Sequence, residues 1–238
     1  MNAARSVVLV TWLLGACGDD GAGPVDASAP PVDIDNGSCG DQIRFTGEYV
    51  DWDTNASFCG INDALIEVPN GSMDGTAPNG RFDLCIPDAP TTRLDVTQPT
   101  AMSQCTTPTS SYSVPTILVA NKMVIQSGGF FSGRAFTTAR QATFFQLVGA
   151  AFDSNKAQVV VHVDAPTARQ VAITAAHGTT QAITTTTWAA GDTGLEVFFP
   201  NVDVGTGTTM LTVTGGAVGT GSIPLVAGTI TNVTVKAN

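Results

Sequence analysis

The stretch Gly80-Arg-Phe-Asp-Leu-Cys-Ile-Pro87 decides the fold class expected for this chain of 238 residues. Apolar Phe82, Leu84 and Ile86 alternate with other residues, so all three would point to one side of an extended backbone. A glycine opens the stretch and a proline closes it, as is typical of the turns that bound a strand. The pattern predicts a β-strand with one face in a core.

The same pattern occurs in the second part of the chain as Gly194-Leu-Glu-Val-Phe-Phe-Pro200. Around both stretches we expect further strands in the same order: 45–51, 64–68 and 92–97 in the first copy, and 158–164, 171–175 and 209–214 in the second. Segments 222–228 and 229–236 would close the second copy as a hairpin. Short strands between turn residues predict an all-β chain of two tandem antiparallel β-sandwiches. Chance similarity between two strand-rich segments is the alternative.

One helix is expected between the two copies, over residues 134–148. Apolar and long side chains recur there at spacings of three and four, and Gly149 suits a helix C-terminus. The residues on this face are Phe136, Arg140, Phe144, Leu147 and Val148. We expect a short connecting helix that docks its aromatic face on a sandwich. A helix lying on a membrane surface would carry many Lys and Arg residues, which this one lacks.

The N-terminal residues have the pattern of a targeting signal. Arg5 precedes a short apolar run that ends in Leu14-Gly15-Ala16-Cys17. This run is too short to span a bilayer, which needs about 20 apolar residues. It resembles a bacterial lipoprotein signal, which implies cleavage before Cys17, lipidation of Cys17 and a lipid anchor in the membrane. An ordinary secretory signal with a chance cysteine is the alternative.

These observations divide the chain into five segments. Residues 18–38 are rich in Gly, Pro, Asp and Ala, a composition that indicates a flexible tether. The segments are a signal peptide (1–16), a lipidated tether (17–42), the first β-sandwich (43–126), a helical connector (127–151) and the second β-sandwich (152–238).

The four cysteines beyond Cys17 predict two disulfides, because an even number of cysteines outside the cytosol is typical of bridges. They are Cys39, Cys59, Cys85 and Cys105. Three pairings are open, and we favour bridges that tie the segment before the first strand to loops. Zinc is a weak competitor, since no C-x-x-C pair exists.

Residues 43–97 resemble the carboxypeptidase regulatory-like domain, and residues 158–214 resemble it more loosely. The matching residues of the first copy are Gly47, Asp51, Ala64, Ile66, Val68, Thr76, Gly80, Phe82, Leu84 and Pro87. Those of the second are Val161, Asp164, Ala172, Ile173, Gly194, Phe198, Pro200, Leu211 and Val213. The resemblance implies transthyretin-like, immunoglobulin-like β-sandwiches and members that are typically not catalytic.

No catalytic residue, metal site or cofactor is predicted. Neither His162 nor His177 begins the H-x-x-E pair of metallocarboxypeptidases, and no G-x-S-x-G or phosphate loop occurs. Intradiol dioxygenases, which have a related sandwich, bind iron through two Tyr and two His. This chain has Tyr49 and Tyr112, but its two histidines are not an H-x-H pair.

A calcium site is an open alternative at one turn. Asp51, Asp53 and Asn55 form a D-x-D-x-N run, but the later positions of an EF-hand loop do not follow. A turn that is capped by its own Asp and Asn side chains is the default.

Charge and aromatic residues limit the partners. The formal net charge of −10 and the absence of a basic run exclude nucleic acid. Trp52 and Trp188 are the candidate ligand-binding residues. The sequence therefore predicts a non-catalytic protein of the bacterial cell envelope that is anchored by lipid on Cys17. We expect it at the periplasmic or surface face of the outer membrane, and the inner membrane stays open as the alternative. Its role would be structural, adhesive or accessory binding to a glycan or envelope protein. A lipoprotein that binds carbohydrate or peptide through loops near Trp52 and Trp188 is the alternative.

Overall fold

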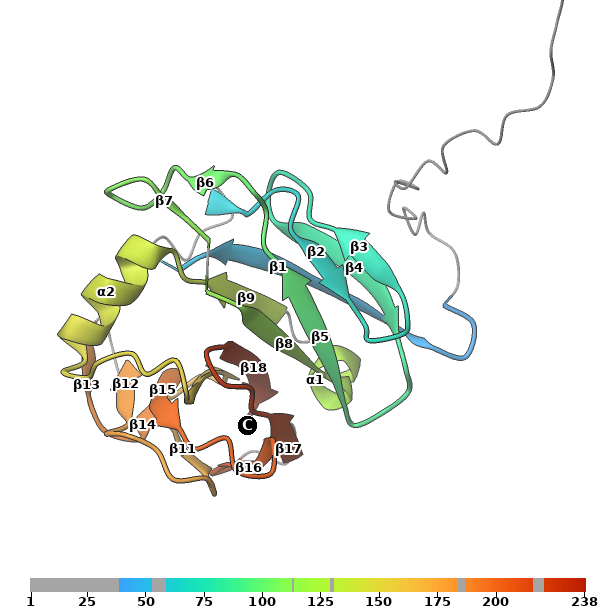
Figure 1. Cartoon of the computed structure of the whole chain (residues 1–238). Helices are drawn as coiled ribbons and strands as arrows, with labels where there is room; N and C mark the ends of the chain where they lie inside the picture. The colour runs from blue at the N-terminus through green and yellow to red at the C-terminus, as the bar shows by residue number, and fades with distance from the viewer. Residues whose placement is uncertain (1–38, 53–58, 113, 129–130, 184–186, 216–220) are drawn as a thin grey trace, which may run out of the picture. The chain divides into compact units, whose positions relative to one another are not determined.

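The computed structural model describes residues 39–52, 59–112, 114–128, 131–183, 187–215 and 221–238, all within one compact unit. This part of the chain contains eighteen strands and two helices (Figure 1). The all-β class expected from the sequence is therefore confirmed.

We call residues 39–135 the first half and residues 157–238 the second half. The strands of the first half are β1 (Ile43–Asp51), β2 (Leu65–Glu67), β3 (Met73–Gly75), β4 (Arg81–Ile86), β5 (Thr91–Thr97), β6 (Met102–Ser103), β7 (Ser110–Ser111), β8 (Thr116–Asn121) and β9 (Phe131–Ala135). Those of the second half are β10 (Ala157–Asp164), β11 (Arg169–Ile173), β12 (Gln181–Ile183), β13 (Trp188–Ala190), β14 (Thr193–Gly194), β15 (Glu196–Val202), β16 (Thr208–Val213), β17 (Gly221–Pro224) and β18 (Ile230–Lys236). The helices are α1 (Lys122–Gln126) and α2 (Thr138–Leu147).

The two halves pair their strands in the same way. β1 pairs antiparallel with β4 and parallel with β9, and β10 pairs antiparallel with β15 and parallel with β18. β2 pairs with β5, which pairs with β8, and β11 pairs with β16, which pairs with β17. Each half thus holds two small groups of strands with matching order.

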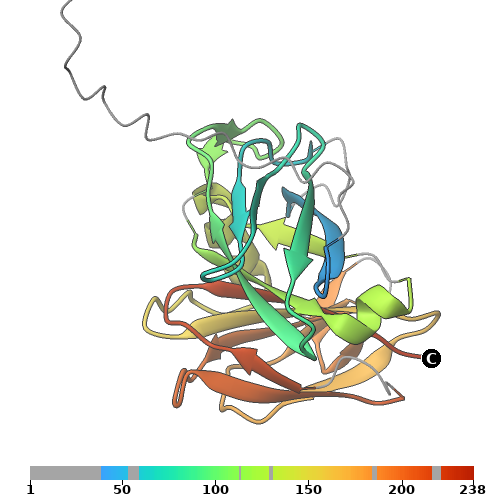
Figure 2. The same cartoon turned by 90° about the vertical axis from the view of Figure 1, so that its right-hand side faces the viewer.

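A single sheet of nine strands joins the halves, in the order β13-β12-β15-β10-β18-β8-β5-β2-β3. The connection is a parallel pair, in which Ile230 to Val233 of β18 run beside Thr116 to Val119 of β8. Figure 2 shows the blue-to-green strands of the first half above the orange-to-red strands of the second half. Sheets β4-β1-β9 and β14-β11-β16-β17, with the small β6-β7 pair, complete the arrangement.

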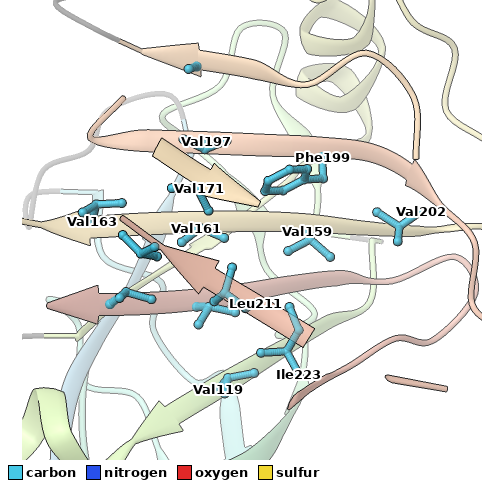
Figure 3. Close-up of a cluster of buried hydrophobic side chains, with 14 of the residues drawn as sticks. Val119, Val159, Val161, Val163, Val171, Val197, Phe199, Val202, Leu211 and Ile223 are labelled. Carbon is cyan, nitrogen blue, oxygen red and sulfur yellow. The ribbon is translucent and has the colours of Figure 1, made fainter. Parts of the chain in front are cut away.

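Each half has its own apolar core. In the second half, Val159, Val161 and Val163 of β10 face Leu211 of β16 and Ile223 of β17 (Figure 3). In the first half, sheet β4-β1-β9 packs on β5, β2 and β8, with these side chains in the core: Phe45, Tyr49, Ile66, Phe82, Leu84, Ile86, Leu94 and Leu118. The predicted inward set of Phe82, Leu84 and Ile86 is among them.

The expectation of purely antiparallel sheets is wrong at three pairs, namely β1–β9, β10–β18 and β18–β8. The expected hairpin of residues 222–236 is also wrong, because β17 pairs with β16 while β18 enters the nine-stranded sheet. Six of the seven residues of β18 are buried, which suits a strand that is covered on both faces rather than one arm of a hairpin.

The expected helix of residues 134–148 begins later than its spacing indicates. Arg134 lies in β9, opposite Val50 of β1, so the pairing of strands prevails over the helical pattern here. A Cβ at Gly133 would lie 2.7 Å from the Leu118 side chain, which shows how closely β9 approaches the sheet. The helix α2 starts only after Thr137, whose side chain accepts a hydrogen bond from the N–H of Arg140.

The docked face of α2 also differs in part from the expected one. Phe144 and Val148 are buried as expected, and Phe145 joins them. Leu147, in contrast, is 66% exposed.

The short helix α1 was not expected from the sequence. Asn121 caps it by accepting hydrogen bonds from the N–H groups of Met123 and Val124.

The four cysteines form two bridges, Cys39–Cys85 and Cys59–Cys105. The expectation of two disulfides is confirmed, and the structure selects one of the three pairings. Cys39 precedes β1 as anticipated, but its partner Cys85 lies in strand β4 rather than in a loop. The second bridge does join two loops.

Candidate functional site

The structure brings the two candidate tryptophans together. Trp52 directly follows β1, where its N–H donates to the carbonyl of Ala135 at 3.1 Å, and Trp188 opens β13. Their rings are 6.2 Å apart between centroids, with 20° between the planes. Residues 136 positions apart in the chain therefore meet where the two halves join.

Other aromatic rings surround this pair. Phe136 stacks on Trp52 at 4.4 Å, Phe144 meets Trp188 edge-on at 5.3 Å, and Phe198 lies 5.0 Å from Phe144. Trp52 is only 4% exposed, so its ring is core rather than a platform on the surface. Trp188 remains half-buried and is the one of the two that a ligand could touch.

A nearly buried ion pair lies beside Trp52. The guanidinium of Arg134 donates to Oε1 of Glu196 at 2.5 Å, and the two side chains are 8% and 12% exposed. The same guanidinium lies 5.9 Å from the centroid of the Trp52 ring, within the range of a cation–π contact. We call Trp52, Trp188, Arg134, Glu196 and His162 the junction site.

His162 completes the junction site from β10, where it lies opposite Glu196. Its Nδ1 is 3.7 Å from Oε1 of Glu196, and its side chain is 37% exposed. Burial by itself would raise the pKa of Glu196. The proximity of His162 and the positive charge of Arg134 outweigh it and hold the pKa of Glu196 below its ordinary value.

Asn232 fixes the strand that carries Arg134. Its side-chain Oδ1 accepts from the backbone N–H of Arg134, and its Nδ2 donates to the Arg134 carbonyl, both at 3.2 Å. Asn232 lies in β18 and is 3% exposed. One buried side chain thus takes the place of a strand partner and holds β9 of the first half against β18 of the second.

The ion pair was missed from the sequence. Arg134 is the first residue of the expected helix, and Glu196 lies inside a predicted strand without being singled out. The sequence did contain one sign of a strand with a buried charge: Arg134 lies within the alternating segment Phe131-Ser-Gly-Arg-Ala135. Its partner, 62 residues away, leaves no local trace.

A second polar group lies in the first half around Asp51, which is 1% exposed. Its Oδ2 accepts from the hydroxyls of Ser103 at 2.5 Å, Tyr112 at 3.1 Å and Thr106 at 3.2 Å. Burial raises the pKa of Tyr112 to about 12, so this phenol keeps its proton at neutral pH. Asp51 therefore serves internal hydrogen bonds.

A cavity of about 240 Å³ adjoins this group. Its wall includes the Cys59–Cys105 bridge, Met102 and Tyr112. Asp53 and Asn55 of the D-x-D-x-N run lie outside the described residues, so a calcium site at that turn stays a prediction.

The four side chains considered for iron have separate surroundings. Tyr49 accepts a hydrogen bond from Gln98, Tyr112 donates to Asp51, and His162 lies beside Glu196. His177 packs against the ring of Phe199. Among the described residues, no group of three or more His, Cys, Asp or Glu side chains is placed to hold a metal ion.

Comparisons with known proteins give the chain no family. No protein-family model matches it, and no curated protein matches it either. Within the described residues, neither helix has the length and apolar character needed to cross a membrane. Cys17 lies outside the described residues.

Proposed function

We propose that this chain is a lipid-anchored protein of the bacterial cell envelope that has no catalytic activity of its own. It would act as a structural, adhesive or accessory-binding protein, held by Cys17 at the periplasmic or surface face of the outer membrane. Its folded part would consist of two carboxypeptidase regulatory-like β-sandwiches.

The cysteine pairing is the observation that supports anchoring most directly. The chain has five cysteines, and Cys39, Cys59, Cys85 and Cys105 pair with one another. Cys17 is the fifth cysteine of the sequence, and it follows the Leu14-Gly15-Ala16 segment that resembles a lipoprotein signal. Two disulfides also agree with an oxidising compartment outside the cytosol.

The repeated strand pairing supports the two-sandwich organisation. β1, β2, β4, β5, β8 and β9 correspond in pairing to β10, β11, β15, β16, β17 and β18. The parallel pairs β1–β9 and β10–β18 occupy matching places in the two halves. In this proposal the nine-stranded sheet arises where β8 of one sandwich meets β18 of the next.

Metabolic labelling with a radioactive fatty acid tests the anchor in a bacterial host that expresses the full chain. We expect label in the wild type and none in Cys17→Ala, with the variant leaving the membrane fraction. The Ser28→Ala variant is the matched control, because it alters another position of the proposed tether and leaves Cys17 unchanged. Label that persists in Cys17→Ala would overturn lipid anchoring at this residue.

Binding of carbohydrate or peptide at the junction site is the second candidate function. The half-buried ring of Trp188 favours it, because Trp188, Glu196 and His162 belong to one row of directly paired residues that crosses the sheet, with Ile183 between Trp188 and Glu196. A glycan and peptide array with the wild type and with Trp188→Ala tests this function. Ligands lost only in the variant would support it, and identical binding by both proteins would exclude the junction site.

A further inference from the structure

All methionines beyond Met1 lie on the surface. The chain has five methionines, and the other four belong to four different elements: Met73 in β3, Met102 in β6, Met123 in α1 and Met210 in β16. They are between 43% and 50% exposed. None of the buried side chains in the described part of the chain is a methionine.

Exposure of all four of these methionines is unusual for this residue type. Methionine is among the side chains most often found fully buried, since its flexible apolar chain fills gaps in cores. Here the cores are built from Val, Ile, Leu, Phe and Ala instead. The β16 strand shows the separation within one element, because Met210 points to solvent while Leu211, next to it, is completely buried.

The exposed positions matter because the thioether of methionine can be oxidised. Oxidation turns an apolar methionine into a polar sulfoxide, which disrupts a core but is tolerated at a solvent-exposed position. The four described cysteines are already paired as disulfides. The four exposed thioethers are therefore the readily oxidised sulfur atoms of the described part.

We propose that Met73, Met102, Met123 and Met210 are modification sites for peroxide-class oxidants, and that the fold persists when all four are oxidised. In each reaction the thioether sulfur attacks one peroxide oxygen and the O–O bond breaks. Sulfur gains one oxygen and becomes a sulfoxide, while the peroxide is reduced to water. Oxidation of these four residues thus consumes four molecules of hydrogen peroxide.

The places of Met73, Met102 and Met123 also agree with this reaction. Met102 borders the cavity of about 240 Å³ beside the Cys59–Cys105 bridge, where an added oxygen atom has room. Met73 lies in an edge strand of the nine-stranded sheet, and Met123 lies in the first turn of α1.

Treatment of the folded full chain, purified in detergent, with hydrogen peroxide tests the proposal. Peptide mass spectrometry should find one added oxygen at each of the four residues, at rates within about a factor of three of those in urea-unfolded protein. The melting temperature of the oxidised chain should fall by less than about 3 °C, because no core side chain has changed.

The double variant M210L/L211M is the matched control, since it keeps the number of methionines and moves one thioether from the solvent face of β16 into the core. Leu-to-Met exchanges of similar volume are well tolerated, so this variant should fold. The thioether that it carries at position 211 should react roughly tenfold more slowly in the folded state than Met210 does in the wild type. After oxidation in urea and refolding, the melting temperature of the variant should fall by about 5 °C or more.

Two outcomes would overturn the proposal. One is strong protection, by about tenfold or more, of any of the four methionines in the folded wild type relative to the unfolded chain. The other is loss of the folded state on oxidation of the wild type, as large as in the double variant.

Discussion

At the scale of single residues, a nearly buried ion pair connects the two halves. Arg134 and Glu196 come from different halves, and their contact is nearly excluded from water. A pair in such surroundings contributes little net stability, but removal of one partner leaves the other charge buried and unpaired. The junction site therefore makes the two halves depend on each other through two side chains.

The stability of the protein should depend on the charge of Glu196 in acid. Because the pKa of Glu196 is lowered by folding, the stability it contributes is present above its unfolded value of about 4.3 and is lost as the pH falls through the folded value. Glu196→Gln should lose about 3 kcal/mol at pH 7, since Arg134 is left unpaired. The difference from wild type should shrink below pH 4, as urea unfolding at several pH values will show.

Glu67→Gln is the control for this experiment, since it removes the same charge from a half-exposed position in β2. It should change stability by less than about 0.5 kcal/mol. An acid dependence in Glu196→Gln that equals that of the wild type would contradict the role assigned to this carboxylate.

At the scale of elements, the sequence predicted most of the long strands close to their observed ranges but missed β8 and β9. Phe82, Leu84 and Ile86 point into one core as expected, and β1, β5, β10 and β16 lie close to their predicted ranges. β8 was missed because all six of its residues are buried, which removes alternation. The end of β9 was wrongly predicted to be helical. Its extended conformation depends on pairing with β1, which lies far away in the sequence: Ser132 pairs with Glu48, 84 residues earlier.

The candidate site could be predicted only in part for the same reason. Trp52 and Trp188 were singled out as rare aromatic residues, and the structure places them together. Burial of Trp52, and the ion pair beside it, follow from contacts between distant strands. The spacing of residues within one segment does not reveal such contacts. It also does not reveal which of the three disulfide pairings forms.

The side chain of Asn232 should be essential for docking β9 onto β18. Asn232→Leu keeps the approximate size but leaves the buried N–H and C=O of Arg134 without their partners. We expect a loss of about 2–5 kcal/mol in the free energy of unfolding, as the sum of two unpaired groups. Equilibrium unfolding in urea measures it.

Thr234→Val provides the matched control on the same strand, two residues along. Thr234 is also buried, and its hydroxyl has no hydrogen-bond partner within the described part of the chain. Replacement by Val should leave stability unchanged or slightly higher. Equal losses in the two variants would show that packing, and not the amide of Asn232, holds β9.

At the scale of the whole described unit, a continuous sheet unites two halves that each possess a core. The β18–β8 pair, the junction site and the Asn232 contacts all cross between the halves. We infer that the halves unfold together, because separating them breaks main-chain pairing as well as side-chain contacts.

Loss of one disulfide should therefore weaken both halves. The pair of changes Cys59→Ser and Cys105→Ser should cost about 2–4 kcal/mol, because it frees a long loop in the unfolded chain. Fluorescence of Trp52 and Trp188, at the junction, and circular dichroism should report one common urea transition. Two separate transitions would contradict unfolding as one unit.

The bridge pairing also determines how the protein responds to pulling. Cys39–Cys85 and Cys59–Cys105 close a ring whose two chain arms, 39–59 and 85–105, are each 20 residues long. A force applied between residue 39 and the C-terminus divides over these arms. Residues 60–84 connect Cys59 to Cys85, and this connection is longer than either arm. It therefore stays slack when the two arms are fully extended, and β2 and β3, which lie in it, bear no load. The 66 residues from Cys39 to Cys105 can stretch to only about 70 Å instead of about 220 Å. If the chain is anchored through Cys17 as proposed, this ring would limit how far the N-terminal end of the folded part can be extended.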